Sequence, residues 1–118
     1  MSTVLRGETC TACRKDSPRV TDAEIAELKP YIPDWELNEV DGVPRLERTF
    51  RFGAYQAALV FTQRVGELAD AEDHHPVIVT EARRVRVIWW THAIRYLHRN
   101  DFIMAAKTDA LLEATTGT

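Results

Sequence analysis

The chain has 118 residues, 45% of them hydrophobic and 28% charged, with a formal net charge of −3. This length and composition are typical of one globular domain with a modest core, and they exclude a disordered chain. Charges interrupt every apolar run well short of the roughly 20 residues that span a bilayer, and the N-terminus lacks the apolar core of a signal peptide, so we expect a cytoplasmic protein without a membrane segment. The small net charge gives no reason to expect a nucleic-acid partner.

Residues 1–20 are predicted to form an arm without helical or strand periodicity, followed by a single domain over residues 21–118. The arm carries the only two cysteines, Cys10 and Cys13, in a C-x-x-C spacing. This spacing fits half of a zinc site, a redox pair, or two reduced thiols without a role. No second C-x-x-C or H-x-x-x-H completes a metal site, so Cys10 and Cys13 are a weak metal candidate and we expect no resident metal.

The first helix of the domain is predicted to begin at Thr21, which forms a T-x-x-E capping box with Glu24. Apolar residues follow at helical spacing. Pro30 and Pro33 end this helix, because proline has no N–H to donate and its ring clashes with the preceding turn.

Two β-hairpins follow, one on each side of a long helix. Strands over 35–40 and 44–52 flank Asp41-Gly42, a strong hairpin signal. Strands over 77–81 and 85–91 form the second hairpin. Along 44–52, apolar residues alternate with charged ones, which indicates a sheet with one buried face.

Apolar residues recur at helical spacing over 54–72, and the last helix is predicted to begin near Asn100. The order is therefore α-β-β-α-β-β-α. We expect an α+β domain in which an antiparallel four-stranded sheet is covered by helices on one face. The other face and the sheet edges would remain open, so we also expect a homodimer, or a tetramer built from two dimers.

Three histidines are predicted to meet at one edge of this sheet. His74 and His75 precede the third strand, and His92 follows the fourth. If these two strands are antiparallel neighbours, the start of one lies beside the end of the other. Asp70 stands one helical turn before His74, and Asp101 opens the last helix nearby.

Imidazoles with carboxylates beside them suit proton transfer near neutral pH, because a carboxylate can hold an imidazole in one tautomer. Three histidines are also a common zinc ligand set. The third alternative is that the paired histidines cap a helix and His92 merely ends a strand. His98 is expected at the surface.

The second hairpin and the segment after it form a basic zone. Residues 77–101 hold five arginines against two acids, a local balance of +3. Such a zone could bind an acidic partner surface, although solvated arginines are the common explanation. The arginines are Arg83, Arg84, Arg86, Arg95 and Arg99.

Over residues 10 to about 112, the motifs P-D-W, L-E-R-x-F-x-F, H-H-P, W-W-T-H and L-H-R-N-D-F-I-M-A-A-K-T-D resemble pterin-4a-carbinolamine dehydratases, most closely the bacterial form with an N-terminal C-x-x-C. The resemblance implies the fold described above and association into dimers or tetramers. It also implies removal of the hydroxyl of a 4a-hydroxytetrahydropterin without a metal or other cofactor. His74, His75 and His92 would carry the acid and base chemistry, with Asp70 and Asp101 beside them.

The chain departs from the family pattern at three positions. Ala82 stands where the family has an aromatic residue, Arg83 where a turn glycine is expected, and Tyr96 where glycine precedes leucine. Loss of a stacking ring and gain of a bulky phenol would spoil a pterin pocket. On this basis we expect a non-catalytic protein with a vestigial site, similar to the dehydratase-like assembly factors that act on Rubisco in α-carboxysomes. Its arginines would face Rubisco or another larger partner. The alternative is an active dehydratase that recycles tetrahydropterin for an aromatic amino acid hydroxylase.

Overall fold

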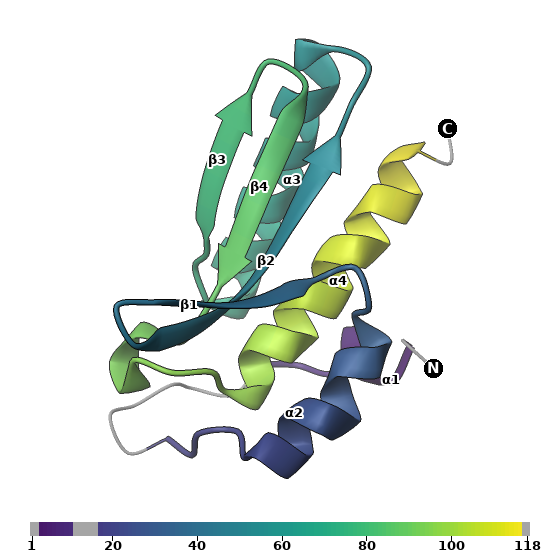
Figure 1. Cartoon of the computed structure of the whole chain (residues 1–118). Helices are drawn as coiled ribbons and strands as arrows, with labels where there is room; N and C mark the ends of the chain where they lie inside the picture. The colour runs from purple at the N-terminus through teal and green to yellow at the C-terminus, as the bar shows by residue number, and fades with distance from the viewer. Residues whose placement is uncertain (1–2, 11–16, 117–118) are drawn as a thin grey trace.

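The computed structural model describes residues 3–10 and 17–116, and its elements follow the predicted order (Figure 1). The helices are α1 Thr3–Arg6, α2 Asp22–Leu28, α3 Tyr55–Glu72 and α4 Arg99–Thr116, with 3₁₀ turns η1 Lys29–Tyr31 and η2 His92–Ile94. The strands are β1 Glu36–Val40, β2 Val43–Arg51, β3 Val77–Glu81 and β4 Arg84–Trp89. The α+β class with a four-stranded antiparallel sheet is thereby confirmed. The single turn α1 lies in the arm, where the sequence predicts no element.

The sheet has the order β1-β2-β4-β3, and every neighbouring pair is antiparallel. Helix α3 contacts β3 and β4, while α4 contacts β2 and β4, so both long helices cover the same face (Figure 1). Strands β1 and β3 are the two edges. The expected dimer would cover the other face or an edge, and it stays a prediction.

The core lies between the sheet and the two long helices. Leu46 and Phe50 of β2 are buried, as the alternation of apolar and charged residues predicts. The Phe50 ring lies 5.9 Å from that of Trp35 and 4.7 Å from that of Phe61 on α3. Burying a side chain of this size contributes about 1.5–3 kcal/mol, so this aromatic cluster fixes how α3 sits on the sheet.

The two strongest local signals of the sequence form as predicted. Thr21 Oγ1 accepts the backbone N–H of Glu24 at 3.1 Å, and Glu24 Oε1 accepts that of Thr21 at 2.9 Å. In the β1–β2 turn, Asp41 has φ 52° and Gly42 has φ 79°. Positive φ at both central residues produces the twist that a two-residue hairpin requires.

Helix α4 is buried on more sides than its sequence pattern indicates. Five consecutive residues, Phe102 to Ala106, are at most 2% exposed. The helix packs against α1, α3, β2 and β4, so its first turns are enclosed rather than one-sided. Within 3–10 and 17–116, none of the helices combines the length and the apolar character needed to cross a membrane.

Candidate active site

Three of the four histidines line one cavity of about 340 Å³. It lies where α3 ends, β3 begins and the chain leaves β4, because antiparallel pairing sets Val77 of β3 opposite Ile88 of β4. The structure thus brings together the histidines that the sequence places at this sheet edge. The lining residues are Asp73, His74, His75, Thr91, His92 and Ala93.

His74 is buried and held on two sides. Asp73 ends α3 in the left-handed region with φ 52°, which turns the chain toward β3; aspartate tolerates this conformation better than most residues. The His74 ring then stacks on Trp89 at 5.6 Å with 7° between the ring planes. Its Nε2 lies 2.7 Å from Asp101 Oδ1, and its side chain is only 8% exposed.

The carboxylate of Asp101 is fully buried and accepts hydrogen bonds on both oxygens. Besides His74 at Oδ1, Thr91 Oγ1 donates to Oδ2 at 2.7 Å and the backbone N–H of His98 donates to Oδ2 at 2.9 Å. A buried carboxylate is stable only with such partners. With Asp101 as acceptor, the His74 proton is held on Nε2 and Nδ1 is left as a base.

His98 is not at the surface, contrary to the expectation from sequence, because it is 7% exposed. It immediately precedes α4, and its Nδ1 accepts the backbone N–H of Asn100 at 3.0 Å. An accepting Nδ1 places the ring proton on Nε2, so the ring is neutral. Burial lowers the pKa of His98 below the usual 6.5, and the nearby His74 lowers it further, whereas Asp101 and Glu24 act in the opposite direction.

The free energy of unfolding is expected to decrease more steeply in the wild type than in His98→Asn as the pH falls below the usual histidine pKa of 6.5. The unfolded chain binds a proton at His98 with the ordinary pKa, whereas the folded chain resists it, so stability rises with pH between the two pKa values. Above that window both states are neutral and the two proteins should follow parallel curves. Urea unfolding between about pH 5 and about pH 8 measures this, and parallel curves over the whole range would contradict it.

His92 lies on η2 and is exposed, and its ring packs against an aromatic neighbour. The His92 ring stacks on Trp90 with 4.3 Å between the ring centroids. The Arg45 guanidinium also lies over the Trp90 ring, 4.1 Å from its centroid. Stacking and cation–π contacts of this kind each contribute on the order of 1 kcal/mol. Arg45 Nε is buried without a hydrogen-bond partner among the described residues, so Arg45 is placed for its contact with Trp90.

His75 lies at the rim of the cavity. Its side chain is 63% exposed, and its Nε2 is 3.9 Å from Asp70 Oδ1, whose side chain is 90% exposed. An exposed pair at this distance stabilises the fold little. Asp70 therefore does not hold His75 as Asp101 holds His74.

The arrangement places groups that can donate and accept protons around one cavity. His74 is a preorganised base with a carboxylate behind it, and His92 presents an imidazole stacked on an aromatic ring. Near neutral pH an imidazole can serve as a base in its neutral form and as an acid in its protonated form. The contact between His74 and Asp101 forms because α4 packs beside the end of α3. From the sequence, Asp101 could be placed near the histidines but not paired with His74.

The three positions that depart from the family pattern do not line this cavity. Ala82 and Arg83 form the exposed turn at the opposite end of the β3–β4 hairpin. Tyr96 lines a separate hollow with Arg19, whose guanidinium lies 4.8 Å from the centre of its ring. Backbone hydrogen bonds of 3.0 and 3.4 Å tie Tyr96 to Thr91 and close the chain around η2.

Three of the five arginines in the basic zone have acidic partners within the chain. Arg84 Nε lies 2.6 Å from Glu81, and Arg86 lies 3.8 Å from Glu47 across the sheet. Arg99 binds both carboxylate oxygens of Glu8 at 2.9 and 2.6 Å, which ties the arm to α4. This hydrogen bond lowers the pKa of Glu8. The zone is therefore less positive than its arginine count indicates, and the partner surface stays a prediction.

The cysteine pair is described only in part. Cys13 lies outside the described residues. Cys10 is half-buried, and its backbone N–H donates to Glu72 Oε1 at 3.0 Å. Among residues 3–10 and 17–116, no three or more His, Cys, Asp or Glu side chains are grouped as metal ligands.

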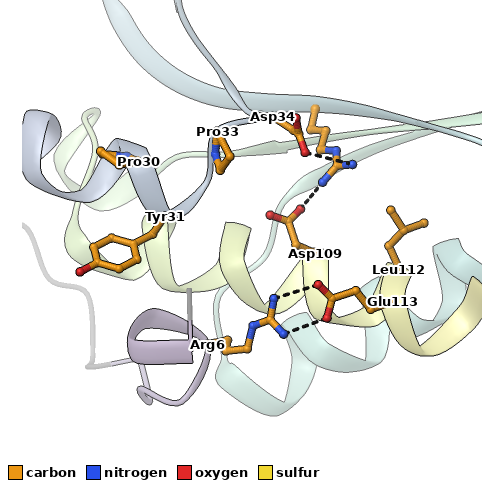
Figure 2. A pocket seen from close by; sticks show the side chains of 9 residues that line it. Arg6, Pro30, Tyr31, Pro33, Asp34, Asp109, Leu112 and Glu113 are labelled. Atoms are coloured by element: carbon orange, nitrogen blue, oxygen red, sulfur yellow. Dashed lines mark hydrogen bonds and ion pairs between the residues drawn. The ribbon is translucent and has the colours of Figure 1, made fainter. Parts of the chain in front are cut away.

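A further hollow, of about 390 Å³, is lined by ion pairs that the sequence does not reveal (Figure 2). Arg6 of α1 lies 2.9 Å from Glu113 of α4, and Arg48 of β2 lies 2.6 Å from Asp109 of the same helix. Burial raises the pKa of Asp109, while Arg48 lowers it. These pairs fasten α1 and β2 to α4, and they lie apart from the histidine cavity.

Comparison with other sequences gives one consistent result. The family model described as pterin 4 alpha carbinolamine dehydratase matches residues 18–111. A putative pterin-4-alpha-carbinolamine dehydratase 1 of Gloeobacter violaceus is 61% identical over 107 residues, which are 91% of this chain and 92% of that protein. A putative pterin-4-alpha-carbinolamine dehydratase of Nitrosococcus oceani is 56% identical over 104 residues, 88% of this chain and 92% of that protein.

Two solved structures share the fold. A transcriptional coactivator/pterin dehydratase from Brucella melitensis has a TM-score of 0.71 and 30% identity, covering 80% of this chain and 98% of its own. A pterin dehydratase-like protein identified as a RuBisCO assembly factor in the α-carboxysome has a TM-score of 0.57 and 24% identity, covering 66% of this chain and 88% of its own. At 24% identity, the second likeness concerns the fold alone.

Proposed function

Because this chain belongs to the pterin 4-alpha-carbinolamine dehydratase family, we propose that it dehydrates a 4a-hydroxytetrahydropterin to the quinonoid dihydropterin. The observation that carries the proposal is the buried pair of His74 and Asp101 at the base of an open cavity that His75 and His92 also line. Membership of the family does not by itself imply that the site is catalytically active. This geometry supports a working site.

In the proposed reaction, His74 Nδ1 accepts the proton of the ring nitrogen while the electron pair of that N–H bond forms the new C=N bond. The C4a–O bond breaks, and the hydroxide leaves as water with a proton supplied by the imidazolium form of His92, which becomes neutral. Asp101 stabilises the imidazolium that forms on His74. His75, at the rim, contacts the bound pterin. Return of the proton from His74 to His92 through water completes the cycle without a cofactor.

The assembly-factor hypothesis has less support. It rests on loss of the pterin pocket at Ala82 and Tyr96, and both residues lie outside the histidine cavity of this chain. The likeness to the RuBisCO assembly factor supports the shared fold. A role toward Rubisco, a carboxysomal location and a dimeric state remain predictions.

The purified protein is expected to accelerate dehydration of 4a-hydroxytetrahydropterin above the spontaneous rate, followed by the absorbance of the quinonoid product. Tyr96→Gly is expected to change kcat by less than about twofold, because its ring lies outside the cavity. A silent wild type together with an active Ala82→Trp, Tyr96→Gly double variant would contradict the proposal. That outcome would favour a binding role.

Trp90→Leu is expected to lower kcat about twofold to tenfold, because it removes the stacking contact that orients His92. Trp90→Phe keeps an aromatic face beside His92 and is the matched control, with a smaller loss expected. Steady-state kinetics on both variants measure the difference. Equal losses would show that the stacked ring does not orient His92.

A further inference from the structure

The His98 side chain lies outside the histidine cavity, yet its backbone N–H donates to the carboxylate behind His74. We propose that His98 is a positioning residue that caps α4 with its neutral ring and thereby fixes Asp101 toward His74. The inference rests on the proposed dehydration and adds a residue to it. The family resemblance and the sequence comparisons assign His98 no role.

The His98 side chain caps the start of α4. The first backbone N–H groups of a helix have no partner within the helix, and a side-chain acceptor at the residue before it supplies one. Here His98 Nδ1 accepts the N–H of Asn100, and Asp101 Oδ2 accepts the backbone N–H of His98. The backbone N–H of Asp101 in turn bonds the carbonyl oxygen of His98 at 2.9 Å. This is a variant of the capping box, in which an imidazole replaces the usual hydroxyl and accepts the N–H of the second rather than the third helical residue.

The Asp101 carboxylate uses its two oxygens for two different contacts. Asp101 Oδ2 takes part in the cap, and Asp101 Oδ1 faces His74 Nε2 at 2.7 Å. A carboxylate held at one oxygen cannot rotate without breaking that bond. The cap, together with Thr91 Oγ1, which also donates to Oδ2 at 2.7 Å, therefore limits where Oδ1 lies and, through it, the orientation of the His74 ring.

The cap depends on the charge of the His98 ring. Nδ1 can accept the N–H of Asn100 only while it carries no proton. The pKa of His98 is lowered chiefly by burial and also by His74, with Asp101 and Glu24 opposing, so the neutral form is favoured. The charged groups Arg19 and Arg99 line the hollow beside the ring. With His98 neutral, a proton taken up beside Asp101 resides on His74, where the reaction needs it.

His98→Asn is the conservative test, because its Oδ1 occupies the position of the imidazole Nδ1 and asparagine is a good cap. His98→Ala removes the acceptor. We expect His98→Ala to lower kcat about tenfold with little change in KM, and His98→Asn to restore kcat to within about twofold of the wild type. Val65→Ala, fully buried on α3, serves as a control for lost stability. It should lower the thermal midpoint and leave kcat unchanged at temperatures where it is folded.

A spectroscopic readout separates this inference from the proposed function. The His74 Nε2 proton bound to Asp101 should give a low-field NMR signal that exchanges slowly, assigned by its loss in His74→Gln. We expect this signal to shift or broaden in His98→Ala, and to persist in His98→Asn and Val65→Ala. An unchanged signal and kcat in His98→Ala would overturn the inference. An inactive wild type with the expected signal changes would instead contradict the dehydratase proposal and leave the positioning role supported.

Discussion

Asp101→Asn is expected to lower kcat for dehydration of 4a-hydroxytetrahydropterin by about a hundredfold, the scale at which positioned acid–base groups contribute. Asp101 is fully buried and binds His74 Nε2 at 2.7 Å. Asparagine keeps the size of the side chain and removes the negative charge that stabilises the His74 imidazolium. Its amide can also present N–H groups to His74, which favours the wrong tautomer. Initial rates, corrected for the spontaneous reaction, measure the effect.

Asp70→Asn is the matched control for this prediction. Asp70 also stands beside a histidine, but the two side chains are exposed and 3.9 Å apart. Screening by water makes such a pair weak, so kcat should stay within about twofold of the wild type. Equal losses in the two variants would show that burial of the pair of His74 and Asp101 is not what matters for the reaction.

Phe61→Ala is expected to lower the free energy of unfolding by about 3–5 kcal/mol, because it opens a cavity in the centre of the core. The Phe61 ring is fully buried on α3 and lies 4.7 Å from Phe50 and 5.3 Å from Phe52. A loss of this size is a large fraction of the stability of one small domain. Urea unfolding at constant protein concentration measures it, because an oligomer would make the midpoint concentration-dependent.

Leu59→Ala on the same helix is the control. Leu59 is 40% exposed, so truncation removes little buried surface and should cost less than about 1 kcal/mol. A loss as large as that of Phe61→Ala would mean that Leu59 is covered in solution, for example by a second copy of the chain. It would then support the predicted dimer.

Local signals predicted most of the fold because each acts within a few residues. The T-x-x-E box at Thr21 and the Asp41-Gly42 turn satisfy backbone groups or supply positive φ where they stand. The alternation along β2 reflects a two-residue repeat that does not depend on what covers the strand. The convergence of His75 and His92 followed from the hairpin, since antiparallel pairing dictates which ends meet.

The placements of Tyr96 and His98 could not be read in the same way. Both follow η2, and Arg95 ends that turn in the left-handed region with φ 49°. An arginine in a sequence gives no indication of this conformation. The contacts that hold the two side chains come from Arg19 and from the first turn of α4. The presence of tyrosine instead of glycine at position 96 suggested that its ring fills the pterin pocket. In the structure the ring lines another hollow.

The sequence by itself determined the element order, the antiparallel sheet, the family and the group of histidines at one edge, because these follow from periodicity, turn chemistry and motifs along the chain. The tertiary structure alone decided which histidine is buried against Asp101, which is stacked on Trp90, and which residue caps α4. It also decided that Tyr96 lies outside the cavity. The physical reason is that burial and hydrogen-bond partners arise where segments distant in sequence pack together, and no local pattern records them.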